Sequence, residues 1–359
     1  MPIFYRKAIE AAIHPDRADW LTEAHLADWT GLALALDRLS EDQRCDAIYI
    51  DWLLRLNDNR TLILPIRDFL IGQGALSANY LAELAQNADD AADGQEAEIR
   101  IVPNGEWLFV CNNGRKITSL NLLGLSRFFF HSAGKVVELN DKTIGRFGIG
   151  FKSCYRIASE VFVFTKDAKG EYGFRLPICR EGDDESQWDA GRLTSLLHKL
   201  GQVGVNNIEA EVQSLRCLGY CTPEFATALR TDLADKMHPL RLGDRGTVFC
   251  FRIRPDRREE VRRKISGHAH ELYELCPLFL PNVRTVQLAQ NTMEMKPTRH
   301  NPANDLADKV KAVKVELTTR TPGQDASTSR FWRLEGTKPG DVWQVALHAD
   351  SDHRLRVER

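Results

Sequence analysis

Residues 83–91 read Glu-Leu-Ala-Gln-Asn-Ala-Asp-Asp-Ala, and this stretch constrains the fold more than any other. Its composition predicts a helix, and Glu83, Asn87 and Asp90 stand at i, i+4 and i+7, so all three project from one helical face. The alanines between them let a ligand or another backbone approach closely. Such a face suits a site that holds a hydrated metal ion and activates a water. From this helix alone, a solvated polar face is an equal alternative.

The predicted helix runs from an N-cap at Ser77 to Ala92, and Gly94 follows where a C-terminal glycine is expected. Residues 1–72 form a separate helical segment, because leucines and tryptophans recur there at near-helical spacing. We expect this segment to pack either on the domain that follows or on a second copy of itself.

Two short strands follow the helix. Residues 98–102 alternate between apolar and polar side chains, residues 107–111 are almost continuously apolar, and residues 103–106 form a tight turn between them. The second strand runs into Asn112-Asn113-Gly114, where polar side chains and a glycine lie at a strand end. Binding loops are common in such places, although a plain turn explains this tripeptide equally well when it is taken alone.

A glycine loop is the most informative segment downstream. Gly145, Gly148 and Gly150 lie at i, i+3 and i+5 and directly precede a helix predicted over residues 152–158. Glycines let a backbone approach a ligand, and the helix aims its first N–H groups at it, so the loop predicts an anion site, most naturally for a polyphosphate. It matches neither the Walker nor the Rossmann pattern. Glycines that merely permit tight packing are the alternative.

The remaining elements follow from composition and periodicity. Residues 131–142 are small and charged without periodicity, which predicts a mobile flap. We further predict a strand hairpin at 160–165 and 172–176, a helical insertion at 181–243, a strand at 245–253, a charged helix at 255–276, and strands at 312–317 and 342–348 separated by a loop at 318–329.

The composition is that of an ordinary globular protein, with 43% apolar and 27% charged residues in a chain of 359. A net charge of −2 gives no global attraction to nucleic acid or anionic membranes. Eight cysteines are scattered, and the closest pair, Cys217 and Cys221, is a poor zinc signal without partners. No signal peptide or bilayer-length apolar run is evident, so we expect a cytoplasmic protein. The chain stops just after an apparent strand, and we interpret it as the N-terminal part of something larger.

These segments stand in the order and spacing of the GHKL ATPases, the family of gyrase, heat-shock chaperones, histidine kinases and MutL. Residues 83–91 resemble the family's E-x-x-x-N-x-x-D-A helix, and residues 112–114 stand where the adenine-reading D-x-G is found. Residues 131–135 resemble the start of the ATP lid, residues 144–153 the phosphate loop, and Gly246-Thr247 the late Gly-Thr strand. The similarity is greatest to the ATP-binding modules of sacsin and the large heat-shock chaperones, over roughly residues 75–290.

The resemblance implies a Bergerat ATP-binding fold, an α/β two-layer sandwich with a mixed, mainly antiparallel sheet and helices on one face. The expected organisation is a helical segment at 1–72, the ATP-binding domain at 73–255 with its insertion at 181–243, and a smaller α+β coupling region at 256–359.

The resemblance also implies roles for the residues of the predicted helix. Glu83 would orient and deprotonate the attacking water, a step that typically contributes roughly 10²–10⁴-fold. Asn87 would ligate Mg²⁺ through its amide oxygen, a hard ligand suited to that ion. Asp90 would support the nucleotide end of the same face. The implied cofactors are therefore ATP and Mg²⁺.

Further implied contacts divide between the phosphates and the base. The phosphate-facing residues would be Ser132, Gly134 and Lys135 in the lid and Gly145, Phe147, Gly148, Ile149, Gly150, Phe151 and Lys152 in the loop. Asn112, Gly114 and Thr247 would recognise adenine, Thr247 through a water. Two positions depart from the family: Asn112 replaces an acid, and Lys116 replaces the second glycine of the adenine motif. Both departures bear on nucleotide affinity and base choice more than on the fold.

The leading interpretation is a slow Mg-dependent ATPase whose output is lid closure and dimerisation through the N-terminal helices. A non-hydrolysing ATP-sensing scaffold is a second hypothesis, which the presence of Glu83 disfavours. A DNA-transaction ATPase of the MutL or topoisomerase type is a third, which the arginine-rich residues 254–264 allow, although such runs are usually solvated. The client or partner protein stays open.

Overall fold

The computed structural model describes most of the chain. The described residues are 5–58, 80–126, 151, 154, 156–168, 170–177, 190–208, 224–225, 231–237, 240, 243–266, 280–289, 291–297, 310–338, 341–349 and 355–357. Within them, no helix combines the length and apolar character needed to cross a bilayer.

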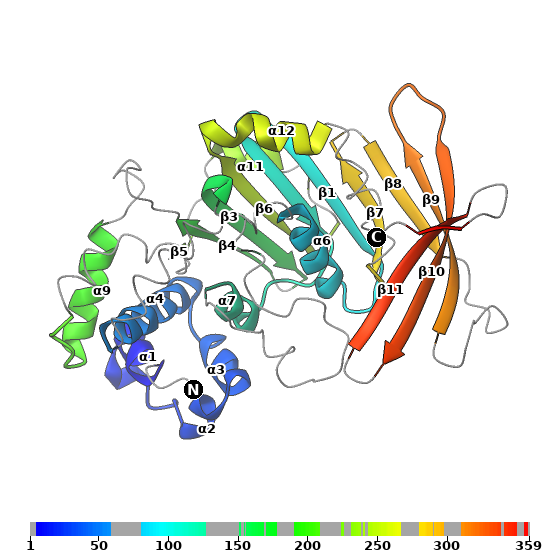
Figure 1. Cartoon of the computed structure of the whole chain (residues 1–359). Coiled ribbons are helices and arrows are strands. Elements are labelled where there is room, and N and C mark those ends of the chain that lie inside the picture. The colour runs from blue at the N-terminus through cyan, green and yellow to red at the C-terminus, as the bar shows by residue number, and fades with distance from the viewer. Residues whose placement is uncertain are drawn as a thin grey trace.

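Helices dominate the first part of the chain and recur between strands later (Figure 1). They are α1 (Tyr5–Ile13), the 3-10 helix η1 (Pro15–Arg17), α2 (Glu23–Ala27), α3 (Trp29–Leu36), α4 (Glu41–Asp58), α6 (Tyr80–Ala91), α7 (Ser119–Ser126), α9 (Ala190–Gln202), α11 (Thr231–Met237), the 3-10 helix η8 (Pro255–Arg257) and α12 (Arg258–Ser266).

The described strands join into one 12-stranded sheet in the order β12-β11-β10-β9-β8-β7-β1-β2-β6-β3-β4-β5. They are β1 (Ala97–Asn104), β2 (Trp107–Asn112), β3 (Ala158–Asp167), β4 (Gly170–Pro177), β5 (Glu224–Phe225), β6 (Gly246–Ile253), β7 (Val283–Leu288), β8 (Asn291–Pro297), β9 (Val310–Arg320), β10 (Ser327–Lys338), β11 (Asp341–Ala349) and β12 (Leu355–Val357). Neighbouring strands pair antiparallel except β1 and β7, which are parallel. The predicted mixed, mainly antiparallel α/β architecture is thereby confirmed.

The β1–β2 hairpin follows directly from its sequence. Gly105 has a φ of 63°, and Asn104 pairs with Trp107 across the two-residue turn. Strand β1 alternates between buried and half-buried residues until its end, whereas all six residues of β2 are buried. Because β2 lies inside the sheet with side chains packed on both faces, its continuous apolar run is what burial demands.

Helices cover both faces of the part of the sheet that contains β2, β3 and β6. On one face, Leu108, Val110 and Phe249 belong to a core cluster with residues of α6 and α12. On the other face, Trp107, Phe109, Cys111, Phe162, Phe164, Val248 and Cys250 pack with Leu233 and Met237 of α11. The expectation of helices on one face only is therefore wrong, because the large apolar side chains on the second face also need a cover.

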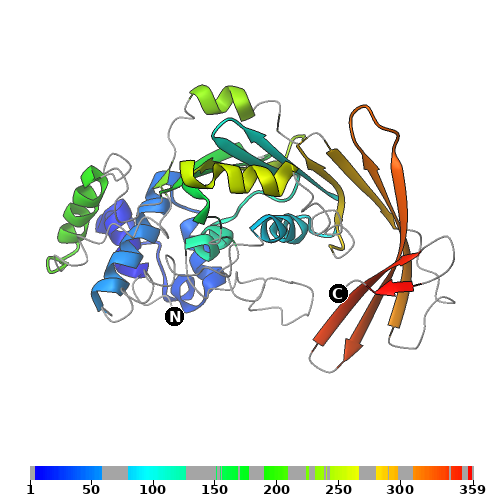
Figure 2. The ribbon, with the colours of Figure 1, turned by 45° about the horizontal axis from the view of Figure 1, so that its top comes forward.

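The N-terminal helices pack on the rest of the same chain. The Trp52 indole N–H on α4 donates to the backbone oxygen of Ser126 at 2.7 Å. Lys199 of α9 forms an ion pair with Asp46 of α4 at 2.5 Å. Figures 1 and 2 show α1 and α4 beside α9, with α7 between these helices and the sheet. Of the two packing arrangements expected for this segment, the intramolecular one is present.

Three predicted boundaries differ from the structure. Strand β3 begins at Ala158, so the helix expected up to that residue ends earlier. The loop expected at 318–329 is shorter, since β9 extends to Arg320 and β10 starts at Ser327. The insertion at 181–243 contains the short strand β5 besides helices α9 and α11. In each case pairing with a neighbouring strand extends or creates a strand inside a segment predicted as helix or loop.

The sheet also crosses the expected boundary at residue 256. Strand β7 pairs with β1 from Ala97↔Val283 to Ile101↔Leu288, and strands β8 to β12 continue the sheet outward from β7. The C-terminal strands therefore add to the same sheet that carries β1 and β2.

Candidate functional site

Helix α6 presents the three predicted site residues beside its buried stripe. Its apolar residues Leu81, Leu84, Ala85 and Ala88, with Ala92 just beyond its end, are buried in the core. Glu83, Asn87 and Asp90 are each half-buried along the neighbouring stripe. The helix is held to the sheet by one side, while its acid, amide and second acid stay partly exposed.

The loop after β2 is fixed to the C-terminal end of α6 by a close contact. The backbone N–H of Arg115 donates to the backbone oxygen of Ala91 at 2.8 Å. A Cβ atom on Gly114 would lie 2.6 Å from the Ala91 Cβ, closer than two carbon atoms can approach. The small residues at 91 and 114 are therefore required by this packing, which brings Asn112 and Gly114 to the end of the helix that carries Asp90.

A row of polar side chains crosses three strands beside this loop. Asn112 on β2 pairs with Thr247 on β6, and Thr247 pairs with Thr165 on β3. All three are buried, and in register they share the sheet face that carries α6. Gly246 has a φ of 145°, and a Cβ there would lie 2.3 Å from the Asn112 backbone oxygen, so only glycine fits. The Gly-Thr pair thus places Thr247 beside Asn112.

Asn112 is already oriented by its own loop. Its Oδ1 accepts the backbone N–H of Gly114 at 3.0 Å. Rotating the amide would set its amino group against this N–H, two donors facing each other, so the bond opposes the rotation. A carbonyl oxygen has a second lone pair, which stays available to a ligand. A pocket at these strand ends is lined by Asn112, Phe164, Thr165, Lys166, Glu171, Arg245, Gly246, Thr247 and Val248.

Lys116, the second departure from the family pattern, belongs to a polar network beside this pocket. Its ammonium donates to the Gly170 backbone oxygen at 3.0 Å and lies 5.0 Å from the centre of the Tyr172 ring. The Tyr172 hydroxyl donates to the backbone oxygen of Ile117. Burial raises the pKa of this phenol, so it stays a neutral donor. The network ties the loop after β2 to the β3–β4 turn.

Sequence reasoning missed Asp89, the neighbour of Asp90. Its carboxylate is 2% exposed, and its Oδ1 accepts the backbone N–H groups of Asn282 at 2.6 Å and Val283 at 3.0 Å. Burial raises the pKa of Asp89, although these two N–H groups act in the opposite direction. Asp89 thereby ties α6 to the start of β7. Its position, i+4 from Ala85 on the buried stripe, is the sequence signal that distinguishes it from Asp90.

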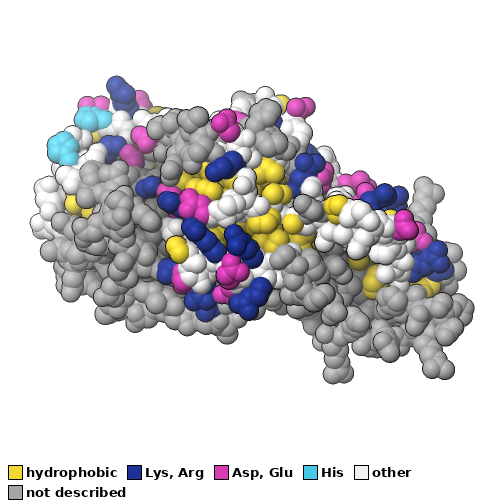
Figure 3. Space-filling model, turned by 90° about the horizontal axis from the view of Figure 1, so that it is seen from above, with side chains coloured by type: hydrophobic (Ala, Val, Ile, Leu, Met, Phe, Trp, Pro, Cys, Tyr) yellow, Lys and Arg dark blue, Asp and Glu magenta, His cyan; other side chains and the backbone are white. Residues whose placement is uncertain are grey.

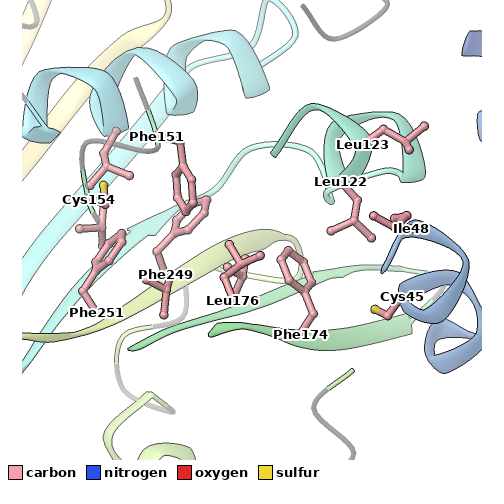
Figure 4. Close-up of a cluster of buried hydrophobic side chains, with 14 of the residues drawn as sticks. Cys45, Ile48, Leu122, Leu123, Phe151, Cys154, Phe174, Leu176, Phe249 and Phe251 are labelled. Carbon is pink, nitrogen blue, oxygen red and sulfur yellow. The ribbon is translucent and has the colours of Figure 1, made fainter. Parts of the chain in front are cut away.

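The glycine loop and the lid lie mostly outside the described residues. The predicted site residues that fall outside are Ser132, Gly134, Lys135, Gly145, Phe147, Gly148, Ile149, Gly150 and Lys152. Phe151 is described: its ring is 6% exposed and lies 5.5 Å from Phe249 and 6.4 Å from Phe251 between ring centres. Figure 4 shows it directed onto the sheet face that bears Phe249. Its side chain is thus part of the core beneath α6, and the predicted role concerned only its backbone amide.

The described residues fit a magnesium ion held largely by its other ligands. No group of three or more His, Cys, Asp or Glu side chains gathers in the described parts of the chain. Asn87 is half-buried on the face that also carries Glu83, and it can offer one amide oxygen. Mg²⁺ in nucleotide sites keeps several waters and phosphate oxygens, so a single protein oxygen at this position is chemically sufficient.

Comparison with known proteins adds no family to this description. No protein-family model matches the chain, and no match was found among curated proteins. Function must therefore be argued from the arrangement of α6, the loop after β2 and the polar row.

Proposed function

We propose that this chain binds Mg-ATP and hydrolyses it slowly. The observation that carries the proposal is the contact between Gly114 and Ala91, where a Cβ on residue 114 would lie 2.6 Å from the Cβ of Ala91. Through it the adenine-reading positions Asn112 and Thr247 lie beside the end of the helix that carries Glu83, Asn87 and Asp90. Residues from separate segments of the chain thereby come together, and the proposal has the base at the polar row and the phosphates along the helix.

Each residue of the helix then has a distinct task. Asn87 supplies an oxygen ligand for Mg²⁺, which neutralises phosphate charge when it is bound. Glu83 accepts the proton of the attacking water, because it stands one turn before Asn87 on the same face. Asp90 lies nearest the loop at Gly114 and supports the nucleoside end. The fold and the half-burial of all three side chains are compatible with these tasks.

The experiment measures ATP binding and turnover separately. Wild-type protein is expected to bind Mg-ATP by calorimetry and to release phosphate slowly. Glu83→Gln should keep binding and lose at least about 100-fold in turnover, because the general base is removed. Asn87→Ala should weaken binding of Mg-ATP. Glu316→Gln, which alters an exposed acid paired with Arg330 at 3.1 Å on β9 and β10, is the matched control and should leave both unchanged.

Each outcome separates the hypotheses. Binding without turnover in the wild type would leave an ATP-sensing scaffold. Wild-type turnover in Glu83→Gln would remove Glu83 as the base. Failure of the wild type to bind ATP would reject the proposal entirely.

The arginine-rich segment does not favour a DNA-transaction ATPase. On α12 and beside it, Arg262 pairs with Glu259 at 3.0 Å, Arg257 with Glu260 at 2.9 Å, and Arg258 with Glu106 at 3.1 Å. Figure 3 shows acidic and basic side chains interspersed over this side of the molecule. Because the positive charge is locally balanced, phosphate contacts in the number that DNA binding needs are not provided by this surface.

A further inference from the structure

The sequence contains two Asn-Gly dipeptides, Asn104-Gly105 and Asn113-Gly114, and they lie at opposite ends of β2. An asparagine followed by glycine is prone to lose its side-chain amide, because glycine has no side chain to keep its backbone nitrogen away from the preceding residue. The two dipeptides therefore share one intrinsic chemistry. The fold gives them different surroundings.

The first dipeptide, Asn104-Gly105, is open to solvent. Both residues are exposed, and a Cβ atom on Gly105 would meet nothing within 4 Å. Among the residues that the structure describes, neither the Asn104 amide nor the Gly105 N–H has a hydrogen-bond partner. Asn104 and Trp107 form the last pair of the β1–β2 ladder, so only this pair has to open for the side chain to reach the Gly105 nitrogen.

The second dipeptide, Asn113-Gly114, is held by hydrogen bonds at each reacting group. The Asn113 Oδ1 accepts the backbone N–H of Glu98 at 2.9 Å, and its Nδ2 donates to the backbone oxygen of Glu96 at 3.2 Å. The Gly114 N–H, whose nitrogen would have to attack, donates to the Asn112 Oδ1 at 3.0 Å. Three hydrogen bonds therefore have to break before the Asn113 side chain can react.

We propose that Asn104 is a site of spontaneous deamidation in the folded protein and that Asn113 is protected from the same reaction. The Gly105 nitrogen loses its proton to hydroxide and attacks Cγ of Asn104. The N–Cγ bond forms and the Cγ–Nδ2 bond breaks, and the side-chain nitrogen takes up a proton from water and leaves as ammonia. The product is a succinimide, and no oxidant or reductant is needed.

Water then opens the succinimide on either side. Addition at Cγ breaks the bond between Cγ and the Gly105 nitrogen and gives aspartate. Addition at the main-chain carbonyl breaks the other carbon–nitrogen bond and gives isoaspartate, in which the backbone runs through the former side chain. Both products add one negative charge, and isoaspartate also lengthens the backbone of the turn by one carbon.

The modified turn is a joint between the hairpin and its neighbours. The Glu106 backbone oxygen accepts the N–H of Ile253 on β6 at 2.7 Å, and the Glu106 carboxylate pairs with Arg258 of α12 at 3.1 Å. Asn104 thus carries its modification next to the contact between β2, β6 and α12, at the end of β2 opposite to the candidate nucleotide site.

The test follows both dipeptides in one sample of the intact wild-type protein. Incubation at mildly alkaline pH and peptide mapping by mass spectrometry should show a growing fraction of Asn104 converted to acid, with aspartate and isoaspartate peptides resolved by chromatography. Asn113 should react at least about 100-fold more slowly, because three hydrogen bonds hold it. In protein unfolded with guanidinium chloride, the two rates should become similar, since only the fold distinguishes the dipeptides.

Asn104→Gln is the matched variant. It keeps an exposed amide, but its longer side chain would have to close a larger ring, so the acidic form that accumulates in the wild type on ion exchange should be absent. Equal rates at Asn104 and Asn113 in the folded protein would overturn the inference. So would an Asn104 that stays intact in the folded protein while both dipeptides react in the unfolded one. Neither result depends on ATP binding, so the proposed function stands or falls separately.

Discussion

The sheet holds two pairs of threonines, one in each half, and in each pair the two side chains lie opposite each other on neighbouring strands. Thr165 and Thr247 join β3 to β6 with their hydroxyl oxygens 2.9 Å apart, and they are 1% and 3% exposed. Thr318 and Thr328 join β9 to β10 at 3.2 Å, and Thr318 is half-buried while Thr328 is exposed to solvent. The chemistry of the two pairs is the same, and the surroundings differ.

The difference shows how burial limits the partners that a hydroxyl can reach. Water can accept from and donate to the exposed pair, so its protons can exchange partners freely. The buried pair meets fixed groups, the N–H of Ile117 and the oxygen of Gly246, so its hydroxyls are confined to these partners and to each other. Figures 1 and 2 show the described helices gathered over the half that holds the buried pair, away from β9 and β10. Polar groups can therefore act as directed contacts in one half and as surface contacts in the other.

The largest effect is expected at Asp89, where α6 is tied to the start of β7 between the two halves. Asp89→Ala leaves the N–H groups of Asn282 and Val283 without their acceptor in a buried place. We expect a loss of about 2–4 kcal/mol in the free energy of unfolding, measured by urea denaturation. Asp325→Ala, in the exposed turn between β9 and β10, is the control and should change it by less than about 0.5 kcal/mol. Equal effects would mean that the burial of Asp89 does not matter.

A smaller effect is expected when the polar row gains a charge. Asn112→Asp retains an oxygen for the Gly114 N–H and adds a stronger acceptor for the amino group of adenine. We expect the ratio of ATP to GTP affinity to rise several-fold, in line with about 1 kcal/mol for such a contact. Asn121→Asp, whose oxygen accepts from Thr118 at 3.0 Å on the exposed start of α7, is the control. An unchanged ratio in Asn112→Asp would place base recognition on other groups.

The pH dependence of stability should separate Asp89 from the exposed acids. Burial raises the pKa of Asp89, so at a pH between its ordinary pKa and the raised one the folded protein holds a proton that the unfolded chain has released. The raised pKa of Asp89 therefore contributes stability that is fully present below the ordinary aspartate pKa of about 4 and is lost as the pH rises through the raised value. The difference in unfolding free energy between the wild type and Asp89→Asn should fall over this interval. A difference that is constant with pH would contradict the raised pKa.

The smallest effect is expected in the exposed pair. Thr318→Val should change the free energy of unfolding by less than about 0.5 kcal/mol, because water replaces the lost hydroxyl contact. Thr165→Val should cost about 1–3 kcal/mol, since Thr165 is buried and the N–H of half-buried Ile117 loses its acceptor. Urea denaturation of both variants measures the contrast directly. A larger loss in Thr318→Val than in Thr165→Val would reverse the comparison.

Elements built from local signals were predicted well. The β1–β2 and β3–β4 hairpins follow from alternating strands and turn residues a few positions apart. The end of α6 follows from Asp93 and Gly94, whose φ angles are 56° and 75°. These features depend on backbone preferences and side-chain periodicity within a short window, and both can be read directly from the chain.

The sequence-based prediction was wrong where contacts with a distant segment determine the structure. The start of β3 at Ala158 depends on its pairing with Ile253 of β6, and no signal near residue 158 announces that partner. The cover of the second face by α11 depends on which large side chains of β2, β3 and β6 come together there. Both outcomes depend on tertiary packing, which overrides local propensity.

The candidate site divides along the same line. The helical spacing of Glu83, Asn87 and Asp90 is visible in the sequence, because it involves one element. The need for small residues at both 91 and 114 comes from a contact between two segments and is decided by the fold. The use of Asp89 is different: its carboxylate binds the N–H of Val283, 194 positions away, where β7 lies parallel to β1. The contacts of the Thr165 hydroxyl likewise involve Ile117 and Thr247 from two other segments. Hydrogen bonds between buried groups are specified by where distant backbones meet, and only the folded chain brings these together.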